Sequence, residues 1–381
     1  MSAETILTNA VVVTGSDTFT GTVVMRDGLI ATIDRAPTTA AGSVDLDGDY
    51  VLPGLVELHT DNLEKHVAPR PGVRWPMRAA VLAHDAQIAA AGITTVFDAL
   101  TVCEVRDNPV RAEMLHDAAE AVGTAQKGGL LRAEHFLHMR CEVGHVAVVE
   151  VFRTFLDDPL LGLVSLMDHT PGQRQFISIE KYFEYYEGKF GYSRAEMSEL
   201  VERRMAEQQL FADKHRRIIA ALCRAQDLPT ASHDDATIAH IDEAVGFGLT
   251  IAEFPTTCEA ARAARANGMT VVMGAPNVVR GGSHSGNVSA SELAAAGLLD
   301  ILSSDYVPFS LLHSVFLLHR ALGLPLADAV AKVSSGPARA VGLDDRGEIA
   351  IGKRADVIRV GLADDGMPIT RHAWRAGRRI V

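Results

Sequence analysis

The chain has 381 residues, of which 48% are hydrophobic and 22% charged, a composition outside the range of disordered or fibrous proteins. Its 36 basic and 48 acidic residues give a net charge of −12, which argues against nucleic acid as a partner, because such binding needs a broad cationic face. Four cysteines without CxxC spacing, no recognisable signal sequence and no apolar run of 18 residues lead us to expect a cytoplasmic protein without disulfides, thiolate zinc site or membrane span.

Both ends of the chain predict short β-strands. Residues 5–14 are a β-branched run, and two apolar segments in 23–30 flank Asp27-Gly28, the dipeptide of a type I′ hairpin. Asp47-Gly48 predicts a second turn of the same kind. The last 35 residues contain three strand-like segments, at 348–351, 355–360 and 373–381. Because neither end makes much of a core alone, we expect 1–54 and 344–381 to form one small β-sandwich domain.

Residues 55–343 alternate short apolar runs with helical stretches, a pattern typical of βα units around a parallel sheet. The eight runs are Leu55–Asp61, Ile93–Ala99, Arg132–Glu142, Leu161–His169, Pro229–His233, Thr250–Phe254, Thr270–Ala275 and Leu299–Asp305. Eight such runs favour an α/β fold of the (β/α)₈ TIM-barrel type over a doubly wound sheet. The long connection 170–228, with helical periodicity in 196–226, predicts an added helical hairpin.

Six side chains at the ends of five of these runs are candidate metal ligands. They are His59, Asp61, Glu142, His169, His233 and Asp305. Strand alternation places His59 and Asp61 on one face and turns Glu142 toward the barrel interior. Since the carboxyl ends of barrel strands meet at one opening, we expect all six to converge there. A hydrogen-bonded structural role explains one such residue well but six poorly, and imidazole with carboxylate suits Zn²⁺ or Mn²⁺.

Cationic and hydroxyl groups near the same strand ends are candidate ligands for an anionic substrate. The Gly-rich segment 274–287 offers backbone amides, an arginine and hydroxyls that suit phosphate oxygens, although it could be a flexible loop alone. The candidate substrate ligands are Lys65, Arg140, Arg174, Arg280, Gly281, Gly282, Ser283 and His284. Asp234, Asp235 and Glu253 are expected to orient the histidines, and Glu253 is also a candidate metal ligand.

Two segments, 51–59 (VLPGLVELH) and 347–356 (GEIAIGKRAD), resemble the bracketing signatures of the amidohydrolase superfamily. Segments 59–65 (HTDNLEK), 165–169, 231–237, 252–257 and 280–287 more narrowly resemble a diphosphatase branch that serves the carbon–phosphorus lyase pathway. The resemblance implies a metal-bearing (β/α)₈ barrel with a terminal β-sandwich. The superfamily usually has His-x-His after the first strand, whereas this chain has Asp61, which that branch shares.

The narrower resemblance implies a metal-dependent hydrolase that cleaves α-D-ribose 1-methylphosphonate 5-triphosphate to the 5-phosphate and pyrophosphate. Two divalent ions are expected, zinc ahead of manganese, to lower the pKa of the attacking water and neutralise phosphate oxygens. Glu142 would bridge the ions, and Asp305 would ligate one and act as general base. Arg140, Arg280 and segment 281–284 would stabilise charge on the transferred phosphoryl group.

Two other functions stay open from the sequence. A deaminase or cyclic-amide hydrolase of the same superfamily would use the same ligands against carbon, and an apolar, aromatic-lined pocket would favour it. A barrel without metals that serves as an assembly scaffold is the second alternative, and missing ligands would favour it. The expected partner is a small-molecule substrate, and a homo-oligomer is compatible with the sequence.

Overall fold

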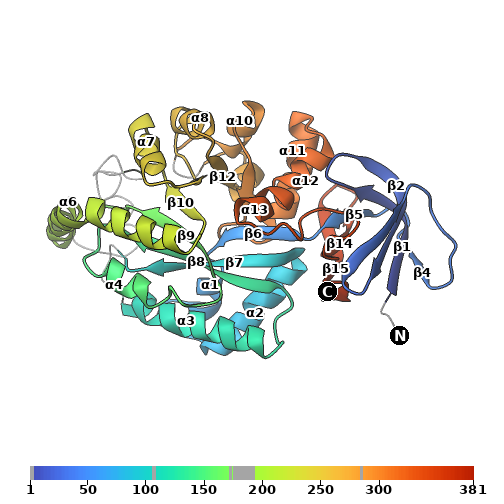
Figure 1. The fold of residues 1–381 in the computed structure, drawn as a ribbon, viewed down its shortest axis with the longest axis horizontal. Helices are drawn as coiled ribbons and strands as arrows, with labels where there is room; N and C mark the ends of the chain where they lie inside the picture. Colours follow the sequence, from blue (N-terminus) through green and yellow to red (C-terminus); the bar gives the residue numbers. More distant parts are fainter. Residues whose placement is uncertain (1–3, 105–108, 171–173, 175–193, 284–285) are drawn as a thin grey trace. The chain divides into compact units, whose positions relative to one another are not determined.

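The two ends of the chain form one sheet in the computed structural model, which describes residues 4–104, 109–170, 174, 194–283 and 286–381. The strand order is β16-β15-β14-β5-β1-β2-β3, with β4 paired to β1. Figure 1 shows the N-terminal strands in blue beside the C-terminal strands β14 and β15 in red. Its members are β1 (Glu4–Val13), β2 (Thr18–Arg26), β3 (Leu29–Asp34), β4 (Ser43–Asp45), β5 (Tyr50–Pro53), β14 (Val357–Leu362), β15 (Pro368–Arg375) and β16 (Arg378–Arg379). One buried core contains Leu7 and Val51 together with Val357 and Trp374. The predicted pairing of the termini is confirmed.

The two Asp-Gly pairs adopt the same backbone but have different consequences. Asp27 (φ 52°) and Gly28 (φ 82°) form the predicted turn between the antiparallel strands β2 and β3. Asp47 and Gly48 have the same positive φ values, yet β4 and β5 both pair parallel with β1 and not with each other. The predicted turn therefore forms, but it joins no hairpin, because a turn dipeptide fixes local dihedrals and not the pairing partner. The strand expected at 348–351 is also absent from these described residues. In place of the strand expected at 373–381, β15 begins earlier, at Pro368, and ends at Arg375.

The eight apolar runs form one eight-stranded sheet in chain order, from β6 to β13. The strands are β6 (Leu55–Thr60), β7 (Ile93–Val102), β8 (Glu134–Glu142), β9 (Leu161–Met167), β10 (Thr230–His233), β11 (Ile251–Glu253), β12 (Thr270–Gly274) and β13 (Ile301–Ser303). A parallel bridge between Thr60 and Asp305 joins the first strand to the end of the last, as a closed barrel requires. All six residues of β6 are buried, as expected for a strand covered on both faces.

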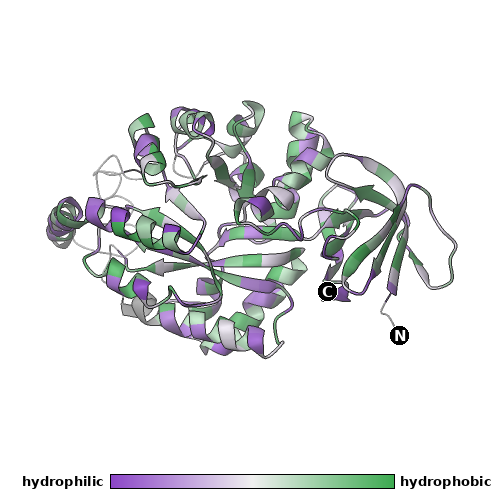
Figure 2. Ribbon diagram, in the orientation of Figure 1, coloured by the Kyte–Doolittle hydropathy of each residue, from purple (hydrophilic) through white to green (hydrophobic). Residues whose placement is uncertain are grey.

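Helices alternate with these strands. They are α1 (Leu63–Val67), α2 (Met77–Ala90), α3 (Pro109–Lys127), α4 (Val148–Arg153), α6 (Arg194–Ala225), α7 (Ile238–Gly246), α8 (Cys258–Ala266), α9 (Ala275–Arg280), α10 (Ala290–Ala295), α11 (Ser310–Leu322), α12 (Leu326–Ala331) and α13 (Ser335–Ala340). Hydrophilic and hydrophobic residues alternate along α6 (Figure 2). Among the described residues, none of the helices has the length and hydropathy that a bilayer crossing needs. The expected helix at 196–226 is confirmed as α6, and the first half of the expected hairpin lies largely outside the described residues.

Contacts between Cα atoms divide the chain into two compact units. The first unit comprises Met1–Asp98, Ala121–Phe136 and Met273–Val381, and the second comprises Ala99–Glu120 and Leu137–Val272. The predicted limits of the terminal domain, 1–54 and 344–381, and of the barrel, 55–343, stay predictions.

Candidate metal centre

In the second unit, His169 and His233 come together from neighbouring strands. His233 ends β10, and His169 follows the end of β9, which pairs parallel with β10. Parallel strands end at the same edge of a sheet, so the two rings meet there, with centroids 5.5 Å apart and planes nearly perpendicular. The sequence predicted both residues as metal ligands, and the structure places them side by side.

Asp234 lies between these two rings. Its Oδ2 atom is 3.5 Å from Nε2 of His233 and 3.7 Å from Nε2 of His169, and it is buried without a hydrogen-bond partner among the described residues. Ligand atoms about 2.1 Å from one tetrahedral zinc ion lie about 3.4 Å apart. The two nitrogens and the oxygen therefore fit a divalent cation, and they are a group that could hold one.

A carboxylate stands behind each of these histidines. Glu142, at the end of β8, accepts a hydrogen bond from His169 Nδ1 at 3.0 Å and another from its backbone N–H at 3.1 Å. Glu253, at the end of β11, accepts one from His233 Nδ1 at 2.6 Å. Both carboxylates orient the ring through Nδ1 so that Nε2 faces Asp234, and in the neutral ring this leaves Nε2 free of a proton to bind a cation. Glu253 thus orients a histidine as expected. Glu142 contacts a predicted ligand, and its bridging role stays a prediction.

The electrostatic environment of this cluster favours a cation. Burial acts to lower the pKa of His169, but the carboxylates of Asp234 and Glu142 outweigh it and raise that pKa to about 9. Burial acts to raise the pKa of Asp234, yet His233, His169 and Arg140 bring the net shift downward. Without a metal, a proton on His169 supplies the positive charge that the surrounding carboxylates demand.

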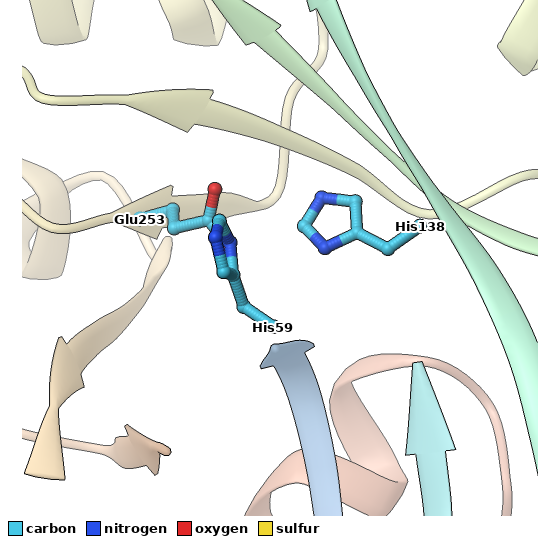
Figure 3. Close-up of side chains that lie close together, drawn as sticks. All are labelled: His59, His138 and Glu253. Atoms are coloured by element: carbon cyan, nitrogen blue, oxygen red, sulfur yellow. The ribbon is translucent and has the colours of Figure 1, made fainter. Parts of the chain in front are cut away.

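His138, on β8, is a site residue that the sequence analysis did not single out as a ligand. Figure 3 shows its side chain with that of Glu253, and a hydrogen-bonded chain joins the two. Ser165 Oγ donates its one proton to Glu253 at 2.9 Å, so it accepts from His138 Nε2. His138 and Glu142 are four residues apart on β8 and so share one face of the strand, and this spacing was a signal that could have found His138.

In the first unit, His59 and Asp305 are adjacent. His59, at the carboxyl end of β6 (Figure 3), accepts a backbone hydrogen bond of 3.1 Å from the amide of Asp305. Thr60 Oγ1 donates to the Asp305 carbonyl at 2.8 Å, and Asp305 has a left-handed backbone with φ 52°. Asp61 has a buried Oδ1 atom without a hydrogen-bond partner among the described residues. The backbone of Asp305, the predicted general base, is thus held against the end of β6, which carries the predicted metal ligand His59.

Glu57 lies below this pair and was missed by the sequence analysis. It is buried, and it accepts hydrogen bonds from the His59 amide at 2.6 Å and from Ser303 Oγ at 2.7 Å. Burial raises the pKa of Glu57 to about 7 against these hydrogen bonds. Its carboxyl group therefore ties the end of β6 to the end of β13. The only sequence signal for this role was that Glu57 is an acidic residue between the apolar residues Val56 and Leu58 of β6.

The predicted metal ligands fall in both units. His59, Asp61 and Asp305 belong to the first, whereas Glu142, His169 and His233 belong to the second. Glu142, His169 and His233 come together in the second unit, and His59 and Asp305 are adjacent in the first. That all six share one centre stays a prediction.

The predicted substrate ligands have varied environments. Arg140 has a buried Nε without a hydrogen-bond partner among the described residues, and Arg280 is exposed at the end of α9. Lys65 Nζ contacts the Tyr306 carbonyl and lies 5.2 Å from the centre of that ring. Ser283 is half-buried, and His284 lies outside the described residues.

Three of these predictions need revision. The amides of Gly281 and Gly282 donate to the carbonyls of Val278 and Asn277, because α9 ends there with Gly281 in the left-handed region. They are therefore engaged within the helix end instead of offered to phosphate. Arg174 is buried and paired with two carboxylates, so it would have to leave both in order to bind a substrate.

A second buried polar cluster lies in the first unit. Asp98, on β7, contacts His84 Nε2 and His135 Nδ1, each at 2.7 Å. These three residues could also hold a metal, but separations of 2.7 Å are those of hydrogen bonds and are shorter than distances between ligands of one ion. Asp98 and the nearby Asp85 outweigh the effect of burial on His135 and raise its pKa to about 9. The cluster is an ionic network.

Comparisons with known proteins agree with this architecture. The model of the amidohydrolase family matches residues 77–365. The α-D-ribose 1-methylphosphonate 5-triphosphate diphosphatase of Escherichia coli K12 is 47% identical over 377 residues, covering 98% of this chain and 100% of the relative. Among solved structures, a 5-methylcytosine deaminase from Klebsiella pneumoniae is 16% identical with a TM-score of 0.67, covering 99% of this chain and 97% of that one. The N-acetylglucosamine-6-phosphate deacetylase of Pasteurella multocida is 12% identical with a TM-score of 0.62, covering 99% of both chains. These two structures share the fold.

Proposed function

The chain belongs to the amidohydrolase family, and we propose that it is a hydrolase that cleaves α-D-ribose 1-methylphosphonate 5-triphosphate to the 5-phosphate and pyrophosphate in phosphonate catabolism. The observation that carries the proposal is the 47% identity to the E. coli diphosphatase along 98% of this chain and the whole length of the relative. The unpartnered Asp234 oxygen between two imidazoles supports metal-dependent chemistry, which an anhydride hydrolase can use.

We propose that the cofactor is a pair of divalent ions, zinc ahead of manganese, because imidazole and carboxylate make up the donor set. The proposed ligands are His59, Asp61, Glu142, His169, His233 and Asp305, with Asp234 added on the geometry given above. When bound, the ions would supply Lewis acidity toward phosphoryl oxygens and increase the acidity of water.

Residues of the chain supply the remaining steps. A carboxylate oxygen of Asp305 accepts the proton of the attacking water, and the hydrogen bonds from Thr60 and to His59 hold its backbone in place. Arg140, Lys65 and Arg280 place positive charge on the triphosphate, which carries about four negative charges, and so stabilise the transferred phosphoryl group. The leaving pyrophosphate retains most of that charge.

The cellular setting is part of the proposal. All four cysteines are free, which supports a reducing cytoplasm, and the net charge of −12 supports a small-molecule substrate instead of nucleic acid. A homo-oligomer is compatible with these features.

The test is release of pyrophosphate from the ribosyl triphosphate by purified protein, with and without a metal chelator. Chelation is expected to abolish release and added zinc to restore it. Asp305→Asn should lower kcat by about 10²- to 10⁴-fold, because the amide cannot accept the proton. Asp328→Asn, which changes an exposed acid on α12, is the matched control and should retain activity. Release that persists in chelator, or full activity in Asp305→Asn, would reject the proposal.

A further inference from the structure

A largely buried chain of charges, with only Glu243 partly exposed, flanks the two histidines of the second unit. Asp168 immediately precedes His169, and Asp235 immediately follows Asp234. Both of these flanking carboxylates are buried, and neither points into the cluster of potential ligands, because each is bound by an arginine.

The first arginine is Arg216, which comes from α6. Its NH2 group donates to Asp168 Oδ2 at 2.7 Å, and Gln208, two turns earlier on the same helix, donates to the same oxygen at 3.0 Å. Asp168 also accepts from the backbone N–H of Thr170 at 3.3 Å. Two side chains of α6 and one backbone amide therefore hold Asp168, the residue next to His169.

The second arginine is Arg174, which binds Asp235. Asp235 also accepts from Ser232 Oγ, and its carbonyl accepts from the amide of Thr256 at 2.8 Å. Asp234, between Ser232 and Asp235, has a left-handed backbone with φ 57°. Contacts on both sides of Asp234 hold it in a conformation that a non-glycine residue rarely adopts.

Glu243, on α7, joins the two halves. Its Oε2 accepts from Arg174 at 2.7 Å, and its Oε1 lies 3.5 Å from Arg216. The result is a chain of alternating charges that starts beside His169 and ends beside Asp234. Buried ion pairs lose much of their attraction to desolvation, and well-packed apolar residues would stabilise the fold as well. Their value here is geometric: guanidinium groups bind two carboxylates in fixed directions.

We infer that Arg216 and Arg174, bridged by Glu243, are positioning residues that set the spacing between His169 and Asp234 for a divalent cation, and that α6 is the element that delivers this control. The inference rests on the proposed metal centre. It adds a role for the helical insertion and for two arginines, one of which the sequence had suggested for substrate binding.

The experiment titrates metal-free protein with zinc in competition with a chromophoric chelator. Arg216→Met is expected to weaken zinc affinity by about 10-fold, the lower end of the loss seen for residues bonded directly to a metal ligand, because Arg216 acts through Asp168. Arg216→Lys should recover only part of the affinity, because an ammonium cannot serve Asp168 and Glu243 together. Arg217→Met is the matched control, since Arg217 is the next residue on α6 and pairs with Asp213 on the exposed face. The zinc affinity of Arg217→Met should stay within about twofold of that of wild type.

The outcomes separate the two proposals. If Arg216 only stabilises the fold, Arg216→Met will lower the urea midpoint of the metal-free protein, and its zinc affinity will equal that of Arg217→Met. This result would overturn the inference. Zinc binding by wild type without pyrophosphate release would reject the proposed substrate, while a selective loss in Arg216→Met would still support the inference. A wild type that binds no zinc would overturn both the metal centre and the inference.

Discussion

Asp234 combines two features that cost free energy. Its backbone is left-handed, and its buried Oδ2 has no hydrogen-bond partner among the described residues. Each feature typically costs about 1–3 kcal/mol. A cation shared with the Nε2 atoms of His169 and His233 would offset both, which explains why the strained arrangement is retained. By contrast, both carboxylate oxygens of Asp98 accept hydrogen bonds from histidines at 2.7 Å, so Asp98 does not need a cation.

The buried network around Asp98 predicts a dependence of stability on pH. The pKa of His135 is about 9 in the folded chain, above its unfolded value of about 6.5. A raised pKa gives stability that is complete below pH 6.5 and is lost as the pH rises through 9. The free energy of unfolding of metal-free wild type should therefore exceed that of His135→Gln by a few kcal/mol, on the order of 2, at pH 6, and by much less at pH 9.5.

Urea unfolding at both pH values measures this difference. His116→Gln is the control, because His116 is exposed on α3 and bonded only to Thr154 in the described network. It should leave the free energy of unfolding nearly unchanged at either pH. A difference between wild type and His135→Gln that does not shrink toward high pH would contradict the assignment of a charged His135.

At the residue scale, the sequence indicated which side chains lie near one another better than it indicated what each one contacts. His169 and His233 could be found because each lies at or just after the end of a strand, and strand ends meet at one rim. Asp234 was expected only to orient a histidine, because sequence reveals neither a positive φ nor which of two adjacent aspartates turns inward. Asp235, its neighbour, turns toward Arg174 instead. The same ambiguity concealed the engagement of Arg174, whose partners come from segments far away in the chain.

At the scale of elements, hydrophobic periodicity was sufficient to predict the strands of the barrel. All eight apolar runs are strands, and the helix expected at 196–226 is α6. The failures occur where no periodic burial exists. Segment 348–351 has the composition of a strand but none forms, and the Gly-rich segment after β12 begins as the short helix α9. Glycines at 281 and 282 predicted an open loop, whereas the first of them ends the helix in the left-handed region.

At Gly347, between α13 and β14, we predict that adding one methyl group lowers the free energy of unfolding strongly. It has φ 84°, and a Cβ there would lie 2.9 Å from the carbonyl oxygen of Ser334 and 2.9 Å from Cα of Ser335. Because backbone must move, Gly347→Ala should lower the free energy of unfolding by at least about 2 kcal/mol. Gly48→Ala is the matched control, since Gly48 has φ 78° and open space around it. It should cost about 1 kcal/mol, measured by urea unfolding. Equal costs would show that the contact with Ser334 does not constrain the chain.

At the scale of the whole molecule, the protein and its proposed triphosphate substrate are both acidic. A net charge of −12 describes the chain as a whole, whereas the cluster around His169 raises the pKa of an imidazole and so favours cations locally. The family and the E. coli relative extend over most of the chain, so the barrel and terminal sheet belong to one inherited architecture. Sequence patterns predicted this architecture because strand order follows chain order. They cannot fix how many ions the proposed ligands hold, since that depends on atomic separations.

The most direct test of the central claim is the metal content of the purified protein, measured by elemental analysis after reconstitution with zinc. Wild type is predicted to hold about two ions per chain. A variant with both His169→Gln and His233→Gln should hold at most one. A wild type that retains no divalent metal, or a double variant that retains as much as wild type, would contradict the proposed centre.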